Sequence, residues 1–145
     1  MEKILIIVQL ATTLSLTGII WLVQIVHYPL FGFVGDEKYR YFHAAHMNLI
    51  AYIVAPLMII EAISAALLVF YPLMNADFRL LLIGIGLILV IWLSTFFVQV
   101  PLHEKFAGGF DADAHLSLVN TNWIRTIAWT LRTALVLWLT WRALK

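Results

Sequence analysis

Four histidines stand near the ends of long apolar stretches, where their side chains could meet and bind a metal ion. His27 follows the first stretch, His43 and His46 precede the second, and His103 follows the third. Imidazole nitrogen is a common ligand of iron, copper and zinc, and it also binds haem iron. The chain has no cysteine, which excludes thiolate metal sites and iron–sulfur clusters. We therefore predict that these four histidines bind iron or copper, or that His27 and His103 bind a b-type haem.

A structural role is the alternative for the same histidines. Imidazole is half apolar, so it suits the interface between membrane and water in the way that tryptophan and tyrosine do. A fifth histidine, His115, lies in a segment without a counterpart elsewhere in the chain, and we assign it no ligand role.

Two segments of the chain repeat a similar residue order. VQIVHYPLF at 23–31 and VQVPLHEKF at 98–106 each place a histidine and a proline shortly after a Val-Gln pair. An asparagine follows each glutamine at nearly the same spacing along the chain, which indicates a duplicated pair of helices. We predict that four amide side chains lie beside the cofactor and orient its histidine ligands: Gln24, Asn48, Gln99 and Asn122. Their structural alternative is to cross-link helices, as buried amides do in membranes.

Two opposite charges lie inside apolar stretches. Glu61 and Arg132 follow Asn48 and Asn122 at similar distances along the chain, so we expect them at similar depth. An isolated charge there costs about 2.5–3.5 kcal/mol, which favours an ion pair between the two side chains. A catalytic role for Glu61, as a proton relay or as the floor of a substrate cavity, is the alternative. Arg125 lies nearer to the histidines, where it would bind an anionic or phenolic oxygen or extend to the membrane surface.

These residues can meet only if long helices position them. Of the 145 residues, 63% are hydrophobic and 12% are charged, whereas about a quarter are charged in a soluble domain. We predict four transmembrane helices at about residues 4–27, 47–71, 79–100 and 122–142. In lipid the backbone must satisfy its own hydrogen bonds, so the expected fold is all-α and integral to the membrane. It is a single domain, residues 1–145, forming an up-down-up-down four-helix transmembrane bundle from two similar αα-hairpins.

Composition also limits the expected partners. The formal net charge is +1 and there is no basic run, so we expect no nucleic acid and instead expect the lipid bilayer. A homo-oligomer or a larger membrane complex stays open. Basic residues are slightly more numerous on the side of the termini (Lys3, Arg79, Arg142 and Lys145) than on the histidine side (Lys38, Arg40 and Lys105). This difference favours cytoplasmic termini in a bacterial inner membrane.

The second half of the chain resembles a known family. PLHEKF at 101–106 and NTNWIRT at 120–126, followed by a final apolar stretch, resemble the anthrone-oxygenase-like family of small four-span membrane proteins. The positions that match are Pro101, His103, Trp123 and, more loosely, Arg125. The resemblance implies a four-helix membrane fold and, from characterised relatives, oxygenation of polycyclic phenolic compounds.

These patterns lead to one main functional prediction. The chain is expected to be a membrane oxidoreductase that uses a histidine-bound metal or haem on a lipophilic small molecule, such as a quinone or phenol. A non-catalytic accessory or assembly subunit of a membrane complex is the alternative. A third hypothesis is a proton-coupled carrier that uses Glu61 and Arg132.

Overall fold

The computed structural model describes residues 2–72 and 77–143, and within these residues it is helical without any strand. The first half of the chain contains α1 (Glu2–Leu22), η1 (Val23–His27), α2 (Tyr28–Leu30), η2 (Phe31–Phe33) and α3 (Asp36–Phe70). The second half contains α4 (Phe78–Ser94), η3 (Thr95–Gln99), α5 (Val100–Glu104), η4 (Lys105–Gly108) and α6 (Ala112–Ala143). The predicted all-α fold is confirmed.

The two halves have the same order of elements. In each, a long α-helix passes into a π-helical segment, a short α-helix and a 3₁₀-helix before the next long helix begins. The π-helical segment comes just before a proline, Pro29 in α2 and Pro101 in α5. Proline lacks an N–H and clashes with the carbonyl four residues earlier, so a wider turn there relieves the helix. The shared order supports the internal repeat that the sequence indicates.

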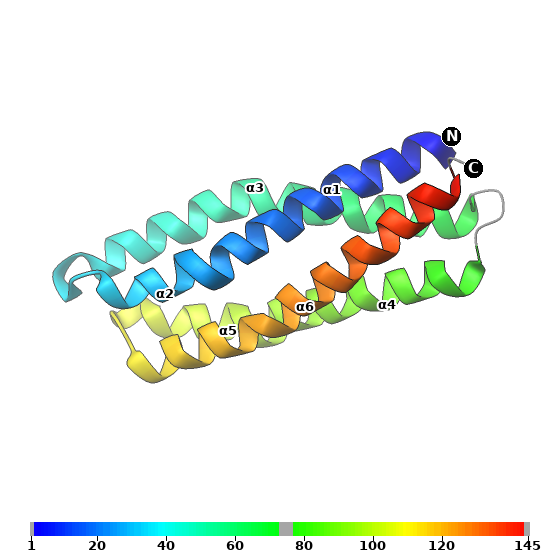
Figure 1. Cartoon of the computed structure of the whole chain (residues 1–145). Coiled ribbons are helices and arrows are strands. Elements are labelled where there is room, and N and C mark those ends of the chain that lie inside the picture. Colours follow the sequence, from blue (N-terminus) through cyan, green and yellow to red (C-terminus); the bar gives the residue numbers. More distant parts are fainter. Residues whose placement is uncertain (1, 73–76, 144–145) are drawn as a thin grey trace.

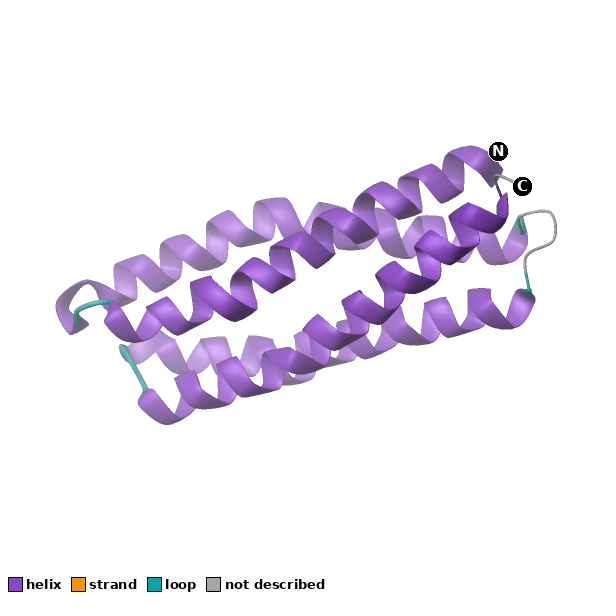
Figure 2. Cartoon of the chain, viewed as in Figure 1, coloured by secondary structure: helices purple, strands orange, loops and turns teal. Residues whose placement is uncertain are grey.

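The described elements form four long helical rods, because α1 continues to Phe33 and α4 continues to Gly108. Figure 1 shows the rods side by side, with both chain termini at one end and the loops that precede α3 and α6 at the other. α1 packs against α3 and α6, and α4 packs against the same two helices, so α1 and α4 lie diagonally. Figure 2 shows how little of the chain lies outside the helices.

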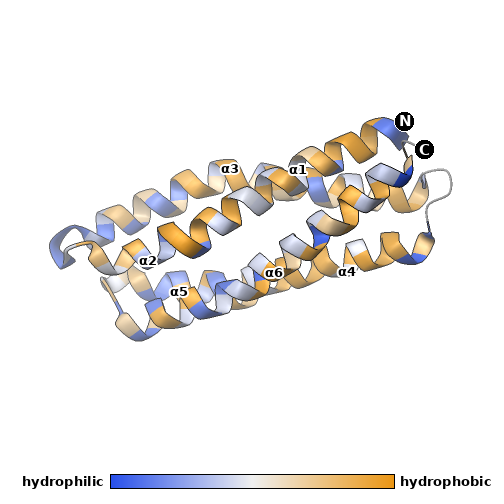
Figure 3. Cartoon of the chain, viewed as in Figure 1, coloured by the Kyte–Doolittle hydropathy of each residue, from blue (hydrophilic) through white to orange (hydrophobic). Residues whose placement is uncertain are grey.

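Hydrophobic residues cover most of the length of the rods, and the loop ends are more hydrophilic (Figure 3). Three rods are long and apolar enough to cross a membrane: Glu2–Phe33, Asp36–Phe70 and Phe78–Gly108. Only 28–33% of their most apolar windows is buried inside the protein, so most of this apolar surface faces outward. Such a surface needs an apolar environment, and lipid supplies one.

The fourth rod is less apolar than the other three, as Arg125 and Arg132 inside its predicted span indicate. α6 does not reach the apolarity of the other three, because polar side chains such as Asn122, Arg125 and Arg132 belong to it. These three side chains are buried against the other helices, whereas its outer face carries exposed leucines, isoleucines and tryptophans.

Two helices are also longer than the predicted spans. α3 begins at Asp36 rather than near 47, and α6 begins at Ala112 rather than near 122. The additional turns are polar but contain good helix formers, so hydropathy alone does not reveal them. Pro56 lies inside α3 without ending it.

Candidate functional site

The four predicted histidines meet at the end of the bundle opposite the termini. His27 Nε2 lies 2.7 Å from His46 Nδ1, and His43 Nε2 lies 3.0 Å from His103 Nδ1. The ring centroids of His46 and His103 are 5.7 Å apart, which brings the two pairs together. We call these four side chains the imidazole cluster. Its members come from η1, α3 and α5, so three separate segments of the chain build it.

Phe31 lies among all four rings of the imidazole cluster. It is fully buried, and its ring centroid lies between 5.1 and 6.3 Å from each of the four imidazoles, in edge-on contact. Phe106, also fully buried, contacts His43 and His103. These aromatic side chains fix the positions of the imidazoles and keep water away from them.

A chain of hydrogen bonds runs into the cluster. Arg125 Nη2 donates to the Tyr28 hydroxyl at 3.2 Å, and the same hydroxyl lies 2.9 Å from His103 Nε2. In the tautomer of His103 that carries its proton on Nδ1, Tyr28 donates to His103 Nε2 and His103 Nδ1 donates to His43 Nε2. Arg125, Tyr28, His103 and His43 are thus joined by one chain of hydrogen bonds.

The cluster differs from the predicted metal site. Within residues 2–72 and 77–143, no group of three or more His, Asp or Glu side chains is placed to hold a metal ion. His43 and His46 were expected to bind one ion together, but each pairs with another imidazole and their rings are 6.4 Å apart. His27 and His103, the predicted haem ligands, pair with different imidazoles. Both ring nitrogens of His103 already have hydrogen-bond partners.

The nitrogen separations within the two imidazole pairs, 2.7 and 3.0 Å, are hydrogen-bond distances, so each pair shares a proton. Binding of iron, copper or haem stays a prediction.

The predicted amides do not touch the imidazole cluster but join helices around it. Gln24 Nε2 donates to the Val119 carbonyl at 3.0 Å, and Gln24 Oε1 accepts from Asn122 Nδ2 at 2.9 Å. Asn122 Oδ1 in turn accepts two hydrogen bonds from the Arg125 guanidinium. The amides of Gln24 and Asn122 therefore hold Arg125 in place, and their role in orienting histidine ligands stays a prediction.

The other two predicted amides, Asn48 and Gln99, do not form a corresponding pair. Asn48 is exposed on α3, so the prediction that it lies beside the site is wrong. Gln99 donates from Nε2 to Thr121 Oγ1 at 2.9 Å. Its Oε1 is buried and has no hydrogen-bond partner within the described residues.

A cavity of about 360 Å³ opens beside the cluster. Most of its wall is apolar and comes from α1, α3 and the rod formed by α4, η3 and α5, with Trp129 of α6 also among the lining residues. The polar residues of the wall are Tyr28, His46, Thr95, Gln99, His103 and Arg125. The cavity therefore combines an apolar body with a group of hydrogen-bonding and basic side chains, which is the usual character of a small-molecule site.

The predicted ion pair forms in the middle of the bundle, away from the cluster. Arg132 Nε lies 2.8 Å from Glu61 Oε1, and both side chains are almost completely buried. Thr13 Oγ1 and Trp129 Nε1 also donate to the carboxylate, at 2.7 and 3.3 Å. Arg132 donates in addition to the Gly84 carbonyl, at 2.7 Å, and to Gln9 Oε1. The pair joins all four rods and has no direct contact with the imidazole cluster.

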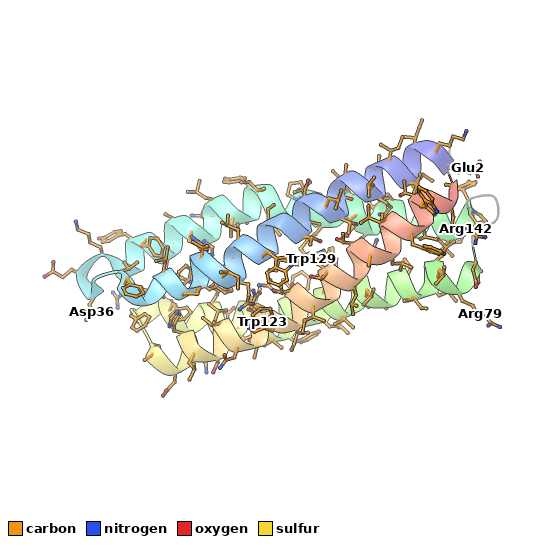
Figure 4. All side chains as sticks on the ribbon, in the orientation of Figure 1. Glu2, Asp36, Arg79, Trp123, Trp129 and Arg142 are labelled. Atoms are coloured by element: carbon orange, nitrogen blue, oxygen red, sulfur yellow. The ribbon has the colours of Figure 1, made fainter. Side chains whose placement is uncertain are left out.

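Trp129 connects the two regions. It is labelled on α6 in Figure 4, where its side chain turns toward the neighbouring α1. Its indole lines the cavity while its N–H donates to Glu61. The ion pair therefore lies directly behind one wall of the cavity.

Sequence reasoning missed Tyr28 and the role of the two phenylalanines. When the repeats are aligned on Gln24 and Gln99, the residue four positions later is Tyr28 in one half and His103 in the other. Seven positions later both halves have phenylalanine, Phe31 and Phe106. The structure brings each of these pairs into contact. Matching His27 with His103 shifts the two repeats by one residue. When they are aligned on the glutamines, the residue that corresponds to His103 is Tyr28.

Comparison with known proteins adds no relative: no protein-family model, curated protein or solved structure matches this chain.

Proposed function

We propose that the chain is an integral membrane oxidoreductase that binds a lipophilic quinol- or phenol-like molecule in the cavity beside the imidazole cluster. The observation that carries this proposal is the position of Tyr28, His46, His103 and Arg125 on the wall of an otherwise apolar cavity. An aromatic ring fits the apolar part of the wall, and its oxygen meets groups that accept protons or stabilise a phenolate. The resemblance to the anthrone-oxygenase-like family points to the same class of compound.

The two imidazole pairs suit the proton chemistry of this reaction. Oxidation of a hydroquinone to a quinone releases two protons and two electrons. His46 and His103 both line the cavity, and each has a second imidazole behind it, His27 and His43 respectively. Each pair can therefore accept one proton, the first directly at His46 and the second at His103 through the Tyr28 hydroxyl, and pass it away from the substrate. The two electrons need a separate acceptor, and iron, copper or a b-type haem, if held by the histidines of the cluster, would supply electron transfer.

The proposal includes the membrane topology. We propose that the four rods cross the bilayer as an up-down-up-down bundle, α6 included, in a bacterial inner membrane with cytoplasmic termini. The outward apolar surface of three rods supports this arrangement, as does the exposed apolar face of α6. A membrane position also gives lipophilic molecules direct access to the cavity.

The test is purification in native lipid without added metal, followed by metal analysis, an absorption spectrum and solvent extraction of bound molecules. We expect iron or copper, or a haem spectrum, together with a co-purified quinone-like compound. Turnover of a short-chain ubiquinol should fall at least tenfold in His103→Gln, because this imidazole takes a substrate proton through the Tyr28 hydroxyl. His115→Gln is the matched control, since His115 contacts the Tyr28 carbonyl outside the cavity and glutamine can also donate there.

One set of results would contradict the proposal. A protein that holds no metal or haem, retains no small molecule and gives the same turnover in both variants is not this oxidoreductase. Constant co-purification with another membrane protein would then favour the accessory-subunit alternative.

A further inference from the structure

Gln24 and Gln99 occupy corresponding positions in the two halves, but their amides are used differently. Both are buried, with 2% and 1% of their surfaces exposed. Every polar atom of the Gln24 amide has a partner: Nε2 donates to Val119, and Oε1 accepts from Asn122 and Thr126. Gln99 uses only its NH₂ group, and its Oε1 is left without a partner among the described residues. One of two equivalent residues thus has a free acceptor.

The orientation of the Gln99 amide follows from its neighbour. Thr121 has one hydroxyl proton, and it donates this proton to the Ser117 carbonyl at 2.7 Å. The hydroxyl can then only accept from Gln99, so the amide atom that faces it must be Nε2. Oε1 is therefore the other amide atom, and a reversed amide would place two acceptors against each other. Gln99 belongs to the cavity wall, and its Oε1, buried within that wall, is an acceptor that lacks a hydrogen-bond donor among the described residues.

We propose that Gln99 Oε1 accepts a hydrogen bond from a hydroxyl group of the molecule in the cavity. Gln99 is then a specificity-determining residue that selects a hydroxylated ring, a phenol or quinol, over its ether or its oxidised carbonyl form. This inference rests on the proposed function, because it assumes that the cavity binds such a molecule. It adds which chemical form is bound and which residue recognises it.

Tyr28 and Asn122 do not replace Gln99 in this role. In the tautomer of His103 that is protonated on Nδ1, Tyr28 donates its proton to His103 Nε2, and Asn122 lies outside the cavity wall and uses Oδ1 to accept from Arg125. A carbonyl oxygen opposite Gln99 Oε1 would leave two buried acceptors facing each other, which costs affinity. Trp92 also lines the cavity, and its Nε1 has no partner within the described residues. It lies about two helical turns before Gln99 and would supply a donor for a second oxygen of the ligand.

The experiment compares a phenol with its methyl ether on the full chain in lipid nanodiscs. The probes are 9-phenanthrol and 9-methoxyphenanthrene, and binding is measured by quenching of tryptophan fluorescence, since Trp92 and Trp129 line the cavity. Concentrations are expressed as mole fraction in lipid, determined with empty nanodiscs. We expect the wild-type protein to bind the phenol roughly ten- to a hundredfold more tightly than the ether. Gln99→Met should lose this preference by weakening phenol binding and should leave ether binding unchanged.

A matched variant separates recognition from folding. Gln24→Met removes a fully paired amide, so we expect it to lower the thermal stability, whereas Gln99→Met removes an unpaired acceptor and should not. Equal affinity of the wild-type protein for phenol and ether would overturn the inference while leaving the proposed function in place. A preference that survives in Gln99→Met would also overturn it. If the wild-type protein binds neither probe, the proposed function falls, and this inference falls with it.

Discussion

The middle of the bundle and its imidazole end contain buried polar side chains in two different states. In the middle, the ion pair of Glu61 and Arg132 has a complete set of hydrogen bonds that reaches all four rods. At the imidazole end, two buried polar atoms of residues that line the cavity, Gln99 Oε1 and Trp92 Nε1, have no partner within the described residues. A complete network stabilises the fold, whereas unpaired groups beside a cavity are available to a ligand. The difference separates the part of the protein that holds the helices together from the part that we propose does chemistry.

The largest effect should come from breaking the ion pair on one side. Glu61→Ala leaves the Arg132 guanidinium buried without its counter-charge and removes the acceptor for Thr13 and Trp129. We expect the free energy of unfolding to fall by about 3–5 kcal/mol, measured by denaturant unfolding in mixed micelles. The double variant Glu61→Met/Arg132→Met should be less destabilised than Glu61→Ala, because no unpaired charge stays buried. A loss below about 1 kcal/mol in Glu61→Ala would mean that the middle of the bundle does not depend on this pair.

The close approach of Arg132 to α4 allows a second test of the same region. A Cβ atom at Gly84 would lie 3.1 Å from Arg132 Nη1 and 3.4 Å from Leu135 Cδ2. Gly84→Ala should therefore push the guanidinium away from the Gly84 carbonyl, and we expect a loss of about 2 kcal/mol in unfolding free energy. Gly86→Ala is the matched control, since nothing lies within 4 Å of a Cβ there. Equal stabilities of the two variants would show that Arg132 adapts without cost.

The sequence predicted depth along the helices better than it predicted which side chains meet. Glu61 and Arg132 were placed at similar depth by counting residues at a constant rise, and they form the expected pair. The histidines were placed at one end because they flank spans that alternate in direction. Rotation about the helix axis is harder to predict, because each residue turns the direction of its side chain by about 100°. A π-helical segment adds a further displacement in each half, which no hydropathy pattern reveals.

Asn48 shows what this rotation changes. The spacing from Gln24 to Asn48 is one position longer than the spacing from Gln99 to Asn122. That single position turns the side chain by about 100°, from the interior to the outer surface. The residue with the equivalent spacing in the first half is Met47, which lines the cavity. The two halves therefore share the order of their elements. They differ at Met47, which occupies the position that corresponds to Asn122 and has no side-chain hydrogen-bond donor to offer Gln99.

The imidazole end should respond to substitution in activity more than in stability. Tyr28→Phe removes the hydroxyl that joins Arg125 to His103 and keeps the ring that packs against Phe31. We expect the free energy of unfolding to fall by only about 1 kcal/mol. Turnover of a short-chain ubiquinol should fall on the order of a hundredfold, because the proton chain into His103 is interrupted. If stability falls by several kcal/mol and turnover per folded molecule is unchanged, the hydroxyl is structural and the contrast between the two regions is lost.

The smallest effect should come from Asn48, which the repeat predicted to lie beside the site but which is exposed on α3. Asn48 is exposed on α3, and no hydrogen bond of its side chain contributes to the described network, so Asn48→Ala should change the unfolding free energy by less than about 0.5 kcal/mol. Asn122→Ala is the comparison, because Asn122 accepts from the Arg125 guanidinium and donates to Gln24. Its loss leaves a buried charge with fewer partners and should cost about 2 kcal/mol in the same unfolding measurement. Equal costs at the two positions would mean that Asn48 faces the interior after all, and Gln99 Oε1 would then have a protein donor instead of needing one from a ligand.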